Sequence, residues 1–82
     1  MPRRSSYVYA PPGARHALVR GPLGMRLRDM GFRSLWCNVQ RGWLVRSERV
    51  TDVLTAAEVA GEPVEFSQRP APPPRPRTGV GA

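Results

Sequence analysis

Apolar and polar positions alternate along the chain with periods that change from strand-like to helix-like. Residues 7–10 form an aromatic and β-branched run that a Pro-Pro-Gly stop follows, which predicts a strand. Residues 16–20 are either a second strand or the continuation of the first strand after a loop. Pro22 suits the first turn of a helix, in which apolar side chains recur at positions 23, 27 and 30 before Gly31 ends it.

The second half of the chain predicts a hairpin, a longer helix and a last strand. Two apolar, aromatic runs, 32–38 and 43–46, flank the turn 39–42 and indicate a hairpin. Ser47 is a suitable N-cap for the helix that follows. The apolar stripe of this helix comprises Val50, Val53, Leu54, Ala57 and Ala60. Gly61 ends the helix, and residues 63–66 predict a final short strand.

The resulting order is β-α-β-β-α-β, which predicts the ferredoxin-like arrangement of the α+β class. In this arrangement a four-stranded antiparallel sheet carries two helices on one face. A domain of about sixty residues hides only about 60% of its unfolded surface. We therefore expect a homodimer, formed through the sheet or through an edge strand, to supplement the small core.

Proline marks a boundary near the C-terminus. Five prolines lie between residues 70 and 76, where they exclude a helix or a central strand. The sequence thus predicts a flexible N-terminus over 1–5, one domain over 6–66 and a disordered Arg/Pro-rich tail over 67–82. The stretch 70–75 is a plain linker or tail, or a proline ligand of SH3-like grooves.

The charge of the chain is large and unevenly distributed. The 82 residues include 13 arginines, no lysine and 6 acidic residues, which give a net charge of +7. Arginine in place of lysine, together with the absence of isoleucine, indicates a GC-rich genome. Residues 1–20 carry +4, 21–46 carry +4, 47–66 carry −4 and 67–82 carry +3. This segregation predicts one basic face and one acidic face.

Several classes of function are disfavoured by the same sequence. The length is too small for a two-domain enzyme with a closed cleft, and no apolar run is long enough to span a bilayer. No apolar segment of a secretory signal follows the basic start. Cys37 is the single cysteine, and His16 has no carboxylate near it in sequence. We expect a cytoplasmic, non-enzymatic protein without metal or cofactor, which does not bind membranes.

The aromatic residues resemble those of RNA-recognition domains, in which the helix-free face of a ferredoxin-like sheet stacks bases. The first strand offers Tyr7 and Tyr9, and the third opens with Arg41-Gly42-Trp43, similar to the start of that family's octapeptide. Strand alternation places Trp43 toward the core and Trp36 outward. The predicted aromatic and basic face is then formed by Tyr7, Tyr9, Trp36, Leu44 and Arg46, with Leu35 and Cys37 pointing inward.

A second resemblance covers residues 23–60. A short helix, a glycine with an aromatic, two tryptophans across a hairpin and an amphipathic helix are similar to small modules attached to primases and annealing helicases, including the HARP-type domain. The matching residues are Leu27, Gly31, Trp36, Trp43, Val45 and Leu54. This resemblance implies contact with single-stranded or forked DNA.

We therefore expect a small accessory protein that binds DNA or RNA mainly through backbone phosphates. The expected nucleic-acid-binding residues are Arg15, Arg20, Arg26, Arg28, Arg33, Arg41, Arg46, Tyr7, Tyr9 and Trp36. The alternative is a protein-interaction module or inhibitor from a phage or mobile element, which docks an acidic surface of a partner protein. A structural subunit of a larger assembly is a third interpretation.

Overall fold

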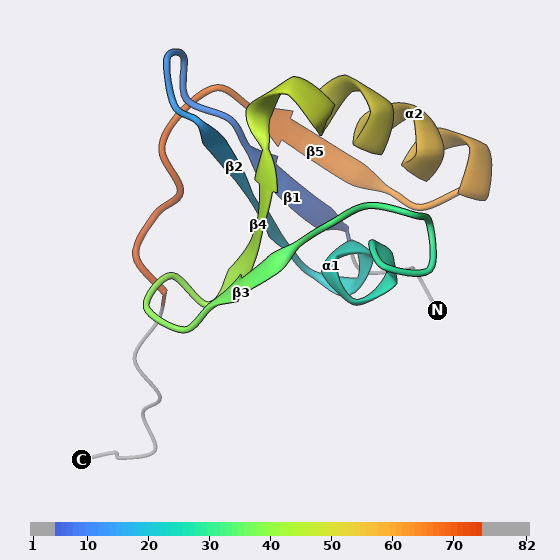
Figure 1. The fold of residues 1–82 in the computed structure, drawn as a ribbon, viewed down its shortest axis with the longest axis horizontal. Coiled ribbons are helices and arrows are strands. Elements are labelled where there is room, and N and C mark those ends of the chain that lie inside the picture. Colours follow the sequence, from blue (N-terminus) through green and yellow to red (C-terminus); the bar gives the residue numbers. More distant parts are fainter. Residues whose placement is uncertain (1–4, 75–82) are drawn as a thin grey trace.

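The computed structural model describes residues 5–74, which form one mixed sheet with two helices (Figure 1). The elements are β1 (Ser6–Tyr9), β2 (His16–Arg20), α1 (Pro22–Arg26), β3 (Leu35–Cys37), β4 (Gly42–Arg46), a 3-10 turn (Ser47–Arg49), α2 (Val50–Ala60) and β5 (Val64–Ser67). Their order in the sheet is β3-β4-β2-β1-β5. The central strand is therefore β2, and β3 and β5 form the two edges.

Strand β5 distinguishes this sheet from the predicted one. It pairs with β1 in parallel, with Ser6 opposite Val64, whereas β1–β2, β2–β4 and β3–β4 are antiparallel. The N–H of Ser6 donates to the carbonyl of Pro63 at 2.9 Å, and that of Ala10 donates to Ser67 at 2.8 Å. The α+β class is confirmed, but the four-stranded antiparallel sheet of a ferredoxin-like fold is wrong. Residues 16–20 are a separate strand, and the helical crossover from β4 gives β5 the direction of β4.

The core lies between the sheet and both helices. Cross-strand partners share a face, so Val8 and Val19 of the inner strands point the same way. Leu23 of α1 and Val53 of α2 pack against them and are fully buried. The buried cluster consists of Val8, Ala17, Val19, Leu23, Leu27, Val45, Val50, Val53 and Ala57. Two helices on one face of the sheet were predicted, and the packing confirms it.

Helix α1 is shorter than predicted because it is α-helical only over Pro22–Arg26. The chain continues as turns to Gly31, which adopts the expected left-handed conformation with φ 90°. Its first turn is capped from another element, since the buried hydroxyl oxygen of Ser6 accepts a hydrogen bond from the N–H of Leu23 at 2.9 Å. This bond joins β1 to the start of α1.

Helix α2 follows the predicted stripe closely. Val50, Val53 and Ala57 are buried, and Gly61 ends the helix in the left-handed region with φ 74°. Ala60 was expected on the stripe but is exposed at the last position of the helix. Ser47 is not the N-cap, because a 3-10 turn intervenes and its hydroxyl donates to the carbonyl of Ala14 at 2.6 Å.

The two predicted mobile ends lie mostly outside the described residues, which exclude 1–4 and 75–82. Of the predicted tail, Ser67 closes β5 and residues 68–74 have no regular secondary structure. Neither helix in the described part of the chain has the length and apolar character needed to cross a bilayer.

Candidate functional site

One face of the sheet is free of helices, and we call it the open face. Because partners in a ladder project to the same side, the registers assign its residues. They are Tyr7, Tyr9, His16, Leu18, Arg20, Leu35, Cys37, Gly42, Leu44, Arg46, Glu65 and Ser67. Aromatic, basic and apolar side chains thus share one surface, on which Glu65 is the carboxylate contributed by the strands.

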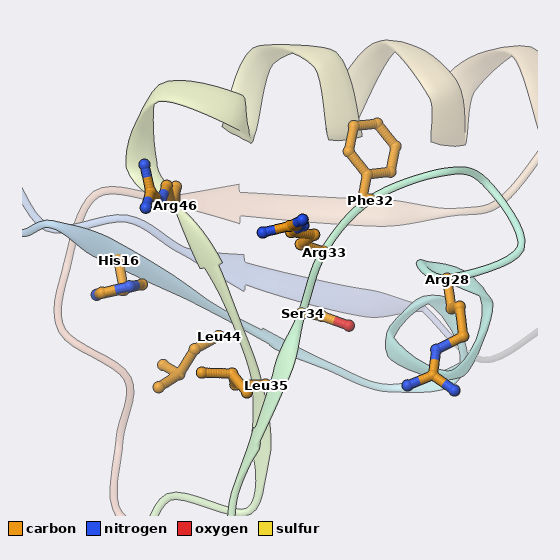
Figure 2. A pocket seen from close by; sticks show the side chains of 8 residues that line it. All are labelled: His16, Arg28, Phe32, Arg33, Ser34, Leu35, Leu44 and Arg46. Atoms are coloured by element: carbon orange, nitrogen blue, oxygen red, sulfur yellow. The ribbon is translucent and has the colours of Figure 1, made fainter.

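A basic pocket of about 480 Å³ lies at one end of the open face (Figure 2). His16 and Arg46 are cross-strand partners on β2 and β4, and Leu44 pairs with Leu35 between them and the edge. Arg33 extends the line of β3, while Arg28 comes from the turn after α1. Among residues 5–74 the lining consists of His16, Arg28, Phe32, Arg33, Ser34, Leu35, Leu44 and Arg46, none of which carries a carboxylate.

The arginines of the basic pocket are available to a ligand. Within the described residues no ion pair involves Arg28 or Arg33. Arg46 approaches Glu48 at 3.5 Å, but both side chains are mostly exposed, and an exposed pair of that length contributes little. Three guanidinium groups beside an apolar floor formed by Leu35 and Leu44 are suited to a group that combines negative charge with a flat apolar surface.

A pair of tyrosines lies on β1 elsewhere on the open face. The rings of Tyr7 and Tyr9 are nearly parallel, with 13° between their planes and 6.2 Å between their centroids. The guanidinium carbon of Arg20 lies 5.8 Å from the centroid of Tyr9, a cation–π contact. Arg20 also donates two hydrogen bonds, of 3.2 and 2.8 Å, to the carbonyl of Gln40. Arg20 is therefore fixed between the tyrosine pair and the β3–β4 turn.

Gly42 of the hairpin and Gly24 of α1 both have packing roles. Gly42 lies beneath the side chain of Leu18, so that a Cβ at this position would be 2.8 Å from Cδ1 of Leu18. Gly24 of α1 lies against the indole of Trp43, and a Cβ there would overlap its Cδ1. The motif Arg41-Gly42-Trp43 thus combines an exposed arginine with two residues that the packing of the sheet requires.

Trp36 was predicted on the open face, and this is wrong. It pairs with Trp43, so both indoles project to the helix side, where their rings meet at 5.3 Å in an edge-on arrangement. Leu35 and Cys37, which were expected inward, lie on the open face instead. Trp36 nevertheless remains 49% exposed because β3 is an edge strand.

The structure brings together most, but not all, of the predicted basic residues. Arg20 and Arg41 lie near the tyrosine pair, and Arg28, Arg33 and Arg46 line the basic pocket. Arg15 precedes β2 and lines a hollow next to His16. Arg26 is directed elsewhere, because it forms an ion pair with the nearly buried carboxylate of Glu62.

His16 is the residue that sequence reasoning passed over. The sequence showed only that His16 has no carboxylate near it; the side chain is exposed at the surface, and the register places it on β2 opposite Arg46. Alternation over residues 16–20 carried the signal, since His16, Leu18 and Arg20 must share a face of any strand formed there. Among the described residues no three His, Cys, Asp or Glu side chains converge as metal ligands would.

Comparisons with known proteins add no relative. No protein-family model, curated protein or solved structure matches the chain. The resemblances to RNA-recognition and HARP-type domains stay predictions. The site is therefore interpreted from its own geometry and charge.

Proposed function

We propose that the protein binds single-stranded nucleic acid on the open face and catalyses no reaction. The observation that carries this proposal is that two near-parallel tyrosines lie on the open face and that a basic pocket, with no carboxylate among its described lining residues, begins on the same face and extends past its edge to Arg28. Unpaired bases stack on aromatic rings without regard to sequence, and arginines neutralise the backbone that joins them. Paired bases are not available to a tyrosine on a sheet, which favours single strands over duplex.

The tyrosine pair and the basic pocket would bind different parts of the nucleic acid. Tyr7 and Tyr9 would stack bases, with Arg20 beside them. Arg28, Arg33 and Arg46 would bind phosphates, while Leu35 and Leu44 contact a sugar or a base. Because phosphate contacts release counterions, binding should weaken steeply with salt, by about −0.7 in log K per log salt for each phosphate neutralised on a single strand.

The test is fluorescence anisotropy with a labelled twelve-residue oligothymidylate and a duplex of the same length at two salt concentrations. We expect the single strand to bind more tightly than the duplex and to be released as salt is raised. Absence of single-strand binding at low salt would show the proposal to be wrong.

A matched pair of variants locates the binding surface. Tyr9→Leu removes a ring from the open face, whereas Phe66→Leu removes an exposed ring from the helix side of β5. Loss of one stacked base costs about 1–3 kcal/mol, so Tyr9→Leu should weaken binding by roughly 5- to 160-fold. Phe66→Leu should leave the affinity unchanged, and thermal unfolding checks that both variants fold.

An acidic protein surface is the alternative partner, because guanidinium groups bind carboxylates as they bind phosphates. Binding of that kind would depend on the basic pocket and not on the tyrosine pair. A pull-down from nuclease-treated lysate, repeated with Tyr9→Leu, separates the two. A partner protein that is still recovered after nuclease treatment, and that the Tyr9→Leu variant binds equally well, favours the alternative.

A further inference from the structure

The chain beyond β5 turns back toward the tyrosine pair. The hydroxyl of Ser67 accepts a hydrogen bond from the N–H of Arg69 at 3.1 Å, a local turn that redirects the backbone at the end of the strand. The following segment reaches the β3–β4 turn (Figure 1). There Pro72, Pro73 and Pro74 line a cavity of about 640 Å³ together with Tyr7, Tyr9, Arg20 and Arg41. We call the wall of this cavity that Tyr7, Tyr9, Arg20 and Arg41 form, opposite the prolines, the tyrosine groove.

The proline segment and the tyrosine groove are chemically complementary. Consecutive prolines favour the polyproline II helix, which has no internal hydrogen bonds and presents flat ring surfaces. Grooves lined by aromatic residues recognise such segments because little conformational entropy is lost on binding. Tyr7 is 40% exposed, and its near-parallel neighbour Tyr9 offers a second ring on the same strand.

The burial pattern of the tail agrees with a seated polyproline II segment. This helix has three residues per turn, so residues three apart lie on the same side. Ala71 and Pro74 are three apart and both are partly buried, whereas Pro72 and Pro73 between them are exposed. One edge of the segment is therefore partly covered, and of its two residues Pro74 lines the cavity with the tyrosines whereas Ala71 does not.

We propose that the tyrosine groove is a binding site for polyproline II segments and that its ligand in this chain is the segment 71–74. The consequence for nucleic acid, which rests on the proposed function, is competition. A single strand must displace the prolines before its bases reach Tyr7 and Tyr9.

The first test uses the full chain and does not involve nucleic acid. In NMR spectra the ring protons of Tyr7 and Tyr9 should show nuclear Overhauser contacts to the ring protons of Pro72, Pro73 or Pro74. A triple variant, Pro72→Ser with Pro73→Ser and Pro74→Ser, keeps every charge and should shift both tyrosine ring signals. Pro70→Ser is the control, because Pro70 does not line the cavity. Absence of these contacts, or tyrosine ring signals that do not shift in the triple variant, would overturn the proposal.

A peptide then tests recognition in trans. A synthetic peptide of residues 68–77, added to the triple variant, should return the tyrosine signals toward their positions in the original chain. A peptide of equal charge with serine at each proline should not. If both peptides act alike, the contact is electrostatic and the polyproline site is wrong.

The competition is measured with the oligothymidylate probe. The triple variant should bind it several-fold more tightly than the original chain, and Pro70→Ser should bind as the original chain does. Equal affinity of triple variant and original chain would overturn the competition. If neither binds the probe, the proposed function and the competition fail together, whereas the Overhauser contacts decide the polyproline site on their own.

Discussion

Gly21 is a single residue that determines how α1 packs on the sheet. It has φ 102° and ψ −171°, a region that is essentially restricted to glycine. A Cβ there would lie 2.8 Å from Cα of Ser6, whose hydroxyl caps the first turn of α1. The close approach of Gly21 to β1 is therefore what places Leu23 over the sheet.

Gly21→Ala should lower the free energy of unfolding by about 2–4 kcal/mol, since backbone strain and steric overlap add. Gly13→Ala is the matched control: its φ is 81°, but no atom of the described part of the chain lies within 4 Å of an added Cβ. That variant should lose only the conformational part, about 1 kcal/mol. Denaturant unfolding measures both, and equal losses would contradict the role of the contact with Ser6.

Trp36 shows what residue-level reasoning missed at the candidate site. Its outward orientation was inferred from alternation around Trp43 without using the hairpin register. A turn over residues 38–41 makes Cys37 and Gly42 partners, and Trp36 then necessarily faces the same side as Trp43. The residues whose face of the sheet was predicted correctly, such as Tyr7, Tyr9 and Arg46, lie on longer strands, where alternation alone fixes the face.

The sequence predicted which helices and strands form better than it predicted how the strands pair. Helix α2 and the hairpin β3–β4 could be predicted because an apolar stripe and a turn are local signals. The parallel pairing of β5 with β1 could not, since it depends on the direction in which the α2 crossover returns the chain. The length of α1 was overestimated because turns continue its apolar spacing as far as Met30.

The β3–β4 hairpin has an anchor that suggests an element-level prediction. Arg20 of β2 donates both of its hydrogen bonds to the carbonyl of Gln40 in the hairpin turn. Arg20→Gln removes this anchor, which should make local opening of the hairpin easier by about 1 kcal/mol. Amide exchange in β3 should then accelerate by roughly fivefold, with little change in α2. Arg46→Gln, at the other end of β4, is the control, and equal acceleration would contradict the anchor.

Across the whole molecule, the arginines differ in whether a carboxylate lies close to them. Arg26 and Arg49 are directed toward carboxylates, the first paired with Glu62 and the second with Asp52 at 3.1 Å. The arginines of the basic pocket have no such partner in the described residues apart from the distant, exposed Glu48. The arginines of the basic pocket are therefore less neutralised by neighbouring carboxylates than Arg26 and Arg49 are.

Two single-charge variants should consequently behave in opposite ways. Arg33→Gln should reduce the steepness of the salt dependence of oligothymidylate binding by about 0.7 while leaving the melting temperature unchanged. Arg26→Gln should lower the melting temperature, because Glu62 loses its partner, and should affect binding much less. Anisotropy and thermal unfolding measure the two effects. Equal binding losses would indicate that only net charge matters.

The expected homodimer would use an exposed edge of the sheet. Edge strand β3 exposes Leu35 and Trp36, the apolar side chains that a second copy could cover. Sedimentation equilibrium should show self-association that Leu35→Lys reduces, because a charge on an edge strand opposes pairing. A monomer at high concentration would contradict this prediction.

The parallel contact between β1 and β5 has a mechanical consequence. The N-terminal side of β1 and the C-terminal side of β5 lie at opposite ends of the same pair of strands. A force applied to the chain at Ser5 and Gln68 would slide the two strands along each other. The ladder hydrogen bonds would then bear the load together instead of opening one after another. The parallel pairing of β5 with β1, which the sequence did not predict, thus makes this small domain resist pulling at its two ends by shear between two strands.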